Sequence, residues 1–122
     1  MCGIYGILDY KNANLELRDL EKMGEAIKMR GPDDTGYYQD EKILLGHNRL
    51  SIIDLTRNGR QPLSNEDGSI WISFNGEIYN YLDIKSKLRQ KHKFLSETDS
   101  EVIIHAYEEF GESLWERLEG MF

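Results

Sequence analysis

The only cysteine of this 122-residue chain lies at the second position, between Met1 and Gly3. Removal of the initiator methionine would make Cys2 the N-terminal residue, with a thiol and a free α-amine on one carbon. An unperturbed α-amine titrates near pH ~7.7–8.0 and a free thiol near ~8.5, so the amine can accept a proton at neutral pH while the thiol needs a base. A nucleophile activated by its own terminal amine is a known catalytic arrangement. A lone cysteine near a terminus is also commonly incidental, so position alone leaves both interpretations open.

A catalytic Cys2 needs an ordered element to hold it, and the residues that follow predict one. Residues 3–9 form an apolar run punctuated by Gly6, which is typical of a buried strand with one close-packed backbone position. A helix is predicted through Arg30, with Asn14 as its cap and Gly31-Pro32 as its end. Its core-facing stripe is Leu17, Leu20, Met23 and Ile27.

The rest of the chain predicts several strands followed by helices. The expected strands are residues 36–39, 43–47, 50–53, 70–74 and 94–95, with a loop at 54–64 and a hairpin turn at 66–68. One helix is expected over residues 81–91. Thr98 to Glu101 has the form of a capping box, so a second helix should follow and stop at Gly111. This helix should bury Val102, Ile103, Ala106, Tyr107 and Phe110. Without regular alternation of strands and helices, the order favours an α+β layered sandwich.

Composition narrows the class of protein. The length suits one domain or part of one, and 39% hydrophobic and 30% charged residues suit a soluble globular chain. A formal net charge of −7 argues against partners such as nucleic acid or an anionic membrane. No apolar run approaches the ~18 residues of a membrane span, and the start does not resemble a signal peptide. A single cysteine excludes an internal disulfide and favours a cytoplasmic location.

Five stretches, in this order and spacing, resemble the glutaminase domain of class II glutamine amidotransferases, and the residues of these motifs are most similar to the asparagine synthetase branch. The stretches are Met1-Cys2-Gly3-Ile4, Arg30-Gly31-Pro32-Asp33, residues 46–54 (GHNRLSIID), residues 74–80 (FNGEIYN) and Thr98-Asp99-Ser100-Glu101. The resemblance covers essentially all 122 residues. Each motif alone is weak evidence for the family, but five motifs in this order and spacing are specific evidence.

The resemblance implies an N-terminal-nucleophile hydrolase fold, a four-layer αββα sandwich. Residues 1–122 would be the N-terminal part of the glutaminase domain, incomplete at its C-terminus, with the synthetase domain absent from this chain. The implied function is hydrolysis of glutamine to glutamate and ammonia, with the ammonia passed to an ATP-dependent asparagine synthetase-type amidation. No cofactor is expected in this domain, since ATP and magnesium would serve only the synthetase domain. Expected partners are glutamine as substrate, the synthetase domain or subunit, and a second copy of the chain in a homo-oligomer.

The resemblance also assigns the catalytic groups. Cys2 would attack the side-chain amide carbon, and its α-amine would take the thiol proton and return one to the leaving nitrogen. The Asn75 side-chain amide and the Gly76 backbone N–H would form the oxyanion hole. Asn-Gly is also a strong turn signal, so a purely structural role for this pair stays open.

Substrate binding would use charges from separate stretches. Arg49 would bind the substrate carboxylate, beside the apolar Leu50 and Ile52. Asp99 would bind the ammonium group with the assistance of Glu77. For Arg49 the alternative is a surface arginine, and for Asp99 it is a helix cap.

Arg30 and Asp33 flank a Gly-Pro and are secondary candidates, which would shape the site or a contact with the synthetase part. His47, His92 and His105 are scattered without metal-ligand spacing, so we expect structural or exposed histidines and no metal site. The chain also has no Walker-type phosphate loop.

A non-catalytic module is the rival hypothesis. Met1 blocks the amine of Cys2 as long as it stays attached, and the apolar Gly120-Met121-Phe122 suggests a chain cut off at the start of a strand. On this view a truncated glutaminase-like module binds glutamine or a partner subunit, and Met121-Phe122 could form an unpaired edge.

Overall fold

The computed structural model describes residues 1–9 and 16–122, so the predicted cap at Asn14 lies outside the described residues. The chain divides into two compact units. Unit 1 contains residues 1–51, 60–62 and 73–75, and unit 2 contains residues 52–59, 63–72 and 76–122. Each unit is therefore assembled from separate stretches of the chain.

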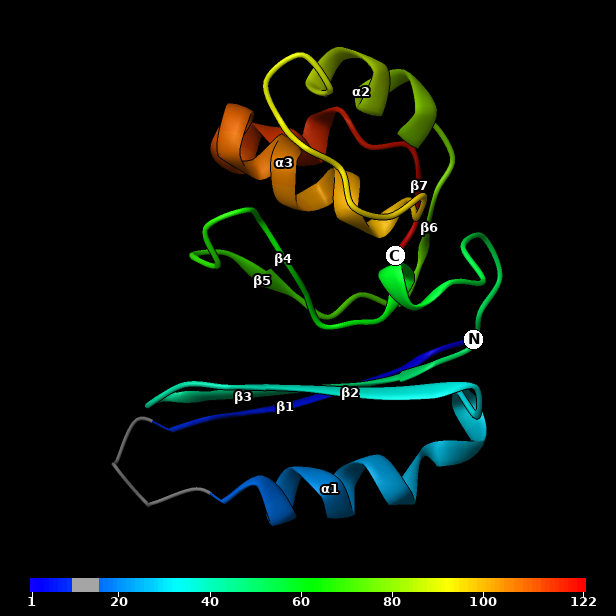
Figure 1. Ribbon diagram of the computed structural model, residues 1–122, viewed down its shortest axis with the longest axis vertical. Coiled ribbons are helices and arrows are strands. Elements are labelled where there is room, and N and C mark those ends of the chain that lie inside the picture. Colours follow the sequence, from blue (N-terminus) through cyan, green and yellow to red (C-terminus); the bar gives the residue numbers. More distant parts are fainter. Residues whose placement is uncertain (10–15) are drawn as a thin grey trace. The chain divides into compact units, whose positions relative to one another are not determined.

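Unit 1 is built on a three-stranded antiparallel sheet with the order β1-β3-β2. Its strands are β1 (Gly3–Leu8), β2 (Asp34–Gln39) and β3 (Ile43–Arg49). In register, Gly3 lies opposite Asn48 and Asp34 opposite Arg49. The helix α1 (Leu17–Ala26) runs along one face of this sheet and is followed by the 3₁₀ helix η1 (Lys28–Arg30) (Figure 1).

Tyr5 is the centre of the core between α1 and the sheet. It packs with Leu20 and Leu44, and Ile7 and Ile27 lie against this cluster. Two glycines make room for its ring, because a side-chain carbon at Gly24 on α1 or Gly46 on β3 would overlap Tyr5. The Tyr5 hydroxyl donates to Oδ1 of buried Asn48 at 2.9 Å, which satisfies the polar end of the ring.

Unit 2 combines two short antiparallel strand pairs with two helices. The strands are β4 (Leu63–Ser64) paired with β5 (Trp71–Ile72), and β6 (Glu77–Ile78) paired with β7 (Gly120–Met121). The helices α2 (Tyr81–Leu88) and α3 (Ser100–Phe110) pack together (Figure 1). Two 3₁₀ helices, η2 (Arg57–Gly59) and η3 (Gly111–Glu116), complete the unit. The buried apolar residues are Ile78, Ile84, Leu88, Val102, Ile103, Ile104, Ala106 and Leu114.

The α+β composition predicted from the sequence is confirmed, but the strand predicted at residues 50–53 is wrong. β3 ends at Arg49 because both neighbouring strands run out there, β1 starting opposite Asn48 and β2 opposite Arg49. Beyond this point Ser51 N–H donates to the Asp33 carboxylate at 2.8 Å, and Ile52 is 61% exposed.

The capping box predicted at Thr98 to Glu101 is also wrong. Asp99 precedes α3 without a capping hydrogen bond from its side chain. The Glu101 carboxylate reaches further back and accepts the N–H groups of Leu95 and Ser96 at 2.7 and 2.8 Å. This use of the Leu95 N–H explains why the strand predicted at residues 94–95 is absent from the described structure.

Other expectations were right in type and wrong in extent. The helix predicted over 81–91 ends at Leu88, and the strand predicted over 70–74 shrinks to β5. Leu17, Met23 and Tyr107 are partly exposed although their spacing predicted burial. Met121 belongs to β7 and pairs with β6, which contradicts an unpaired edge at that residue. No helix among the described residues is long and apolar enough to cross a membrane.

Candidate active site

Cys2 is half-buried immediately before β1, and its thiol contacts the chain that leaves β3. The sulfur lies 3.3 Å from the backbone nitrogen of Leu50 and accepts its N–H, and it lies 3.6 Å from the Leu50 carbonyl oxygen. The geometry therefore presents the thiol on an ordered backbone with one donor in place.

Arg30 and Asp33 fasten the backbone on both sides of this thiol. Arg30 Nε donates to the carbonyl oxygen of Cys2 at 3.0 Å. Asp33 uses its N–H to reach the Arg49 carbonyl at 3.0 Å and its carboxylate to accept the Ser51 N–H at 2.8 Å. Gly31 lies between them against the β3 backbone, where a side-chain carbon would come within 2.6 Å of the Arg49 nitrogen. These contacts give the Arg-Gly-Pro-Asp stretch a positioning role.

Arg49 is the last residue of β3 and is only 6% exposed. This burial contradicts the alternative of an ordinary surface arginine. The Arg49 charge also acts on His47, whose pKa is lowered mainly by burial and further by this neighbouring guanidinium. Arg49 is therefore a buried cation at the same end of β3 that contacts Cys2 through Leu50.

Asn75 is held through its neighbour Phe74, whose backbone is bound by two side chains of unit 1. The Phe74 carbonyl accepts a hydrogen bond from His47 Nε2 at 3.1 Å, because a carbonyl can only accept. The Phe74 N–H donates to Oε1 of buried Gln61 at 2.7 Å. Ser73 adds a third link, from its hydroxyl to the Gly46 carbonyl at 3.0 Å. The segment before Asn75 is thus fixed to Gly46 and His47 of β3 and to Gln61.

Sequence reasoning missed the positioning roles of His47, Asn48 and Gln61. Asn48 is buried, donates to the Gly24 carbonyl at 2.7 Å and accepts from Tyr5 at 2.9 Å, so it joins β3 to α1 and β1. The available signal was polarity, since His47 and Asn48 follow four apolar or glycine residues within β3. A buried polar side chain requires a partner, and here the partners fix the backbone.

Unit 2 brings Glu77 and Asp99 together. Asp99 is buried, and its Oδ2 accepts the N–H of Ile78, the residue after Glu77, at 2.7 Å. Burial raises the pKa of Asp99. The pKa of Glu77 is raised by burial and by the nearby Asp99 charge. Two carboxyl groups that share a partly desolvated site favour a bound cation, such as an ammonium group, because it relieves their repulsion.

The predicted residues thus form two sets, one in each unit. Unit 1 holds Cys2, Arg30, Asp33, Arg49, Leu50 and Asn75, and unit 2 holds Ile52, Gly76, Glu77 and Asp99. Asn75 is the last residue of the final stretch of unit 1, and Gly76 is the first residue of the final stretch of unit 2. Within unit 2, His92 and His105 are not scattered, since their ring centroids lie 4.7 Å apart.

Comparison with known proteins identifies the class. A family model described as a glutamine amidotransferase domain matches residues 1–122, and the chain belongs to this family. Over 125 residues it is 45% identical to asparagine synthetase [glutamine-hydrolyzing] 2 of Bacillus subtilis (strain 168), covering 100% of this chain and 16% of that protein. It is 43% identical over 123 residues to asparagine synthetase [glutamine-hydrolyzing] of Zea mays, covering 100% of this chain and 21% of that protein. The chain therefore spans about a fifth or less of the length of these curated relatives.

Proposed function

We propose that this chain hydrolyses glutamine to glutamate and ammonia, with Cys2 as an N-terminal nucleophile. The observation that carries the proposal is the position of the thiol, which lies 3.3 Å from the Leu50 N–H on a backbone fastened by Arg30. Membership of the glutamine amidotransferase domain family supports the same chemistry. The relatives' printed names add that they are glutamine-hydrolysing.

The proposed reaction begins after removal of Met1 frees the α-amine of Cys2. This amine takes the thiol proton, and the thiolate attacks the side-chain amide carbon of glutamine to form a C–S bond. The intermediate's oxyanion accepts hydrogen bonds from the Asn75 side-chain amide and the Gly76 N–H. The α-ammonium returns a proton to the leaving nitrogen, the C–N bond breaks and ammonia departs. Water then attacks the thioester, the C–S bond breaks, and glutamate is released with the thiol restored.

The α-carboxylate and the α-ammonium of the substrate would be bound by protein side chains of opposite charge. Buried Arg49 would hold the α-carboxylate through its planar guanidinium. Asp99 and Glu77 would hold the α-ammonium, and Leu50 and Ile52 would contact the aliphatic part. The raised pKa values of both carboxyl groups fit this role, since a bound ammonium would stabilise their charged forms.

We further propose the context in which this hydrolysis occurs. The residues would form the N-terminal part of a four-layer αββα N-terminal-nucleophile hydrolase domain, working with a synthetase domain or subunit. Ammonia would pass to an ATP- and magnesium-dependent amidation of the asparagine synthetase type, in agreement with the relatives' names. A cytoplasmic location and a homo-oligomer stay predictions.

The test is glutamate release from glutamine by the purified chain, beside Cys2→Ala and Cys2→Ser. Intact-mass spectrometry establishes whether Met1 is removed, and circular dichroism establishes that each variant is folded. Release by the processed protein and its loss in both variants supports the proposal. A folded, processed chain that binds glutamine without releasing glutamate overturns it and favours the non-catalytic module.

A further inference from the structure

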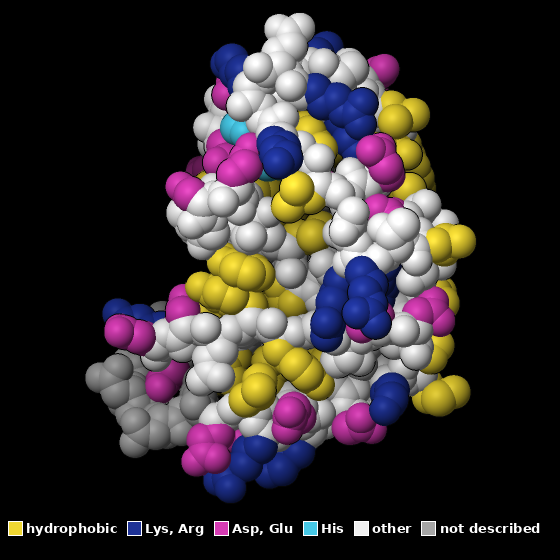
Figure 2. Space-filling view, viewed as in Figure 1, with side chains coloured by type: hydrophobic (Ala, Val, Ile, Leu, Met, Phe, Trp, Pro, Cys, Tyr) yellow, Lys and Arg dark blue, Asp and Glu magenta, His cyan; other side chains and the backbone are white. Residues whose placement is uncertain are grey.

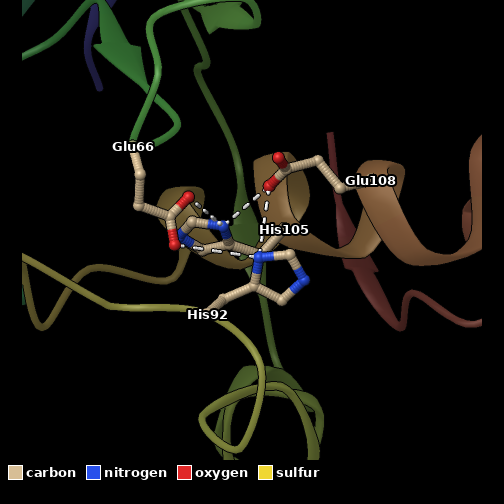
Figure 3. Close-up of side chains that lie close together, drawn as sticks. All are labelled: Glu66, His92, His105 and Glu108. Atoms are coloured by element: carbon tan, nitrogen blue, oxygen red, sulfur yellow. Dashed lines mark hydrogen bonds and ion pairs between the residues drawn. The ribbon is translucent and has the colours of Figure 1, made fainter.

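A second group of chemically active side chains lies wholly within unit 2. It consists of Glu66 from the turn between β4 and β5, His92 from the segment after α2, and His105 and Glu108 from α3 (Figure 3). Each residue contributes one potential metal-ligand atom, and these four atoms all lie within 4.8 Å of one another. We name these four residues the His/Glu cluster.

The distances within the His/Glu cluster match a small four-coordinate ion. His105 Nδ1 lies 3.0 Å from Glu108 Oε2 and 3.7 Å from Glu66 Oε2. His92 Nδ1 lies 3.4 Å from Glu108 Oε2 and 3.8 Å from Glu66 Oε1. Tetrahedral zinc with bonds of ~2.0–2.1 Å places neighbouring ligand atoms roughly 3.3 Å apart. These four distances lie on both sides of this value, and with one ligand atom from each residue all separations stay within 4.8 Å, so binding an ion would require the side chains to close in by up to about an ångström.

Both imidazole rings have the orientation that metal-bound histidines adopt. Each points Nδ1 into the cluster and Nε2 toward a carboxylate outside it. His92 Nε2 lies 3.2 Å from Glu109, and His105 Nε2 lies 3.8 Å from Glu101. Metal-ligating histidines almost always donate their second N–H to such a group, which fixes the ring. His105 is 1% exposed, and its Nε2 has no hydrogen-bond partner among the described residues. A small movement of Nε2 toward the Glu101 carboxylate would give it one.

The two carboxylates of the cluster are also held by fixed donors. Glu108 Oε1 accepts from Asn65 Nδ2 at 2.9 Å, which leaves Oε2 directed at both histidines. Glu66 Oε1 accepts the Lys93 N–H at 2.8 Å. Asn65 is itself buried and accepts the Ile70 N–H at 3.1 Å. These hydrogen-bond donors come from the β4–β5 hairpin and from the segment after α2. The cluster is therefore held by tertiary contacts between several elements.

The charges around the cluster favour a cation. Glu66 and Glu108 face the rings from inside, and Glu101 and Glu109 face them from outside. Lys91 pairs with Glu109 at 2.5 Å and offsets the charge of that carboxylate. Figure 2 shows a histidine side chain at the surface among acidic side chains in the part of the chain that contains α2 and α3.

We propose that Glu66, His92, His105 and Glu108 bind a zinc ion. Imidazole nitrogens favour zinc over calcium and magnesium, which prefer ligand sets made of oxygen alone. Four protein ligands leave no open position, so the role is structural. The ion joins the β4–β5 turn, the segment after α2 and α3.

The test is titration of the chelator-treated protein with zinc chloride at neutral pH, followed by calorimetry and by the change in Tm. We expect one saturable equivalent and a raised Tm. Glu108→Gln and His92→Gln should each weaken binding at least about tenfold, because they remove a ligand while keeping a side chain of similar size. Glu112→Gln is the matched control, since it removes an exposed carboxylate outside the cluster and should bind as the parent does.

The Cys2 thiol is an alternative zinc ligand outside the His/Glu cluster. The same titration distinguishes zinc bound by Cys2 from zinc bound by the cluster. Cys2→Ser should keep full binding, and the cobalt(II) derivative should show tetrahedral absorption without a sulfur-to-cobalt band. Absence of saturable binding by the folded parent overturns the proposal, as does unchanged binding in both ligand variants. Either result would make the cluster a hydrogen-bonded histidine–carboxylate network. None of these measurements uses glutaminase activity.

Discussion

The candidate site of unit 1 and the His/Glu cluster of unit 2 organise their polar residues in opposite ways. Around Cys2 and Asn75 in unit 1, three polar side chains bond to backbone groups: Arg30 to Cys2, Asp33 to Ser51, and His47 to Phe74. In unit 2 the His/Glu cluster is made of side chains that contact other side chains across loops and α3. The first arrangement depends on strand register, and the second depends on how separate segments close on one another.

This comparison predicts that the two units fail differently when altered. A change at the end of β3 should alter the chemistry attached to the backbone there. Changes in the cluster of unit 2 should alter stability and ion binding and leave the thiol geometry of unit 1 intact. The following predictions test this division, from the largest expected effect to the smallest.

Asn75→Ala should reduce kcat/KM for glutamine hydrolysis by about 10²–10³, because it removes one proposed oxyanion donor. The matched control is Asn58→Ala, in the second Asn-Gly pair of the chain, which is exposed and should leave kcat/KM unchanged. Steady-state kinetics with both variants measures this difference. Equal effects of the two substitutions would mean that Asn75 acts only as a turn residue.

Gly46→Ala should destabilise unit 1 by about 1–3 kcal/mol, because the added carbon would overlap the Tyr5 ring in a filled core. Gly68→Ala is the comparison in unit 2. It has open space around it but a φ of 74°, so only the backbone penalty of roughly 1 kcal/mol applies. Urea unfolding measures both values. A larger loss at Gly68 than at Gly46 would contradict the packing around Tyr5.

Glu101→Gln should destabilise the fold by about 1–3 kcal/mol, since this buried carboxylate accepts two backbone N–H groups and the Ser96 hydroxyl. Asp33→Asn is its counterpart in unit 1. Asp33→Asn weakens the hydrogen bond between the Ser51 N–H and the exposed Asp33 side chain, so it should lower the free energy of unfolding less than Glu101→Gln does. It should also lower turnover, because this bond holds the segment beside Cys2. Thermal unfolding and kinetics on both variants separate the two effects. Reduced turnover without lost stability in Glu101→Gln would contradict the division between units.

His47 should give the smallest effect, a loss of stability as the pH falls below ~6.5, the unperturbed imidazole value. Its pKa is lowered in the fold, so the unfolded chain binds the proton more readily, and acidification favours unfolding. Unfolding free energies measured across this range should fall more steeply for the parent than for His47→Gln. An imidazole that titrates above ~6.5 by NMR would be inconsistent with this burial.

Local patterns in the sequence were sufficient where neighbouring residues decide the structure. The apolar runs placed β1 and β3, and helical spacing placed α3 close to its observed bounds, while the first helix was predicted through Arg30 and α1 ends at Ala26. The strand predicted at residues 50–53 failed because the ends of β1 and β2 decide where β3 stops. The capping box failed because the Glu101 carboxylate has stronger partners further back along the chain.

Residues of the candidate site follow the same rule. Cys2 and Arg49 could be proposed from motif and residue type, while the support of Asn75 by His47 and Gln61 depends on contacts between distant stretches. The cluster of unit 2 was missed because no short spacing joins Glu66, His92 and His105. Only the folded chain brings their side chains together.

The chain passes between the two units at five places, after residues 51, 59, 62, 72 and 75. Neither unit therefore corresponds to one uninterrupted stretch of its gene. A recombination event within residues 51–76 would divide both units at once, because each unit has stretches on both sides of that point, and these would then come from different parents. These units are expected to be inherited and exchanged together, and an engineered fusion should carry them as a single cassette.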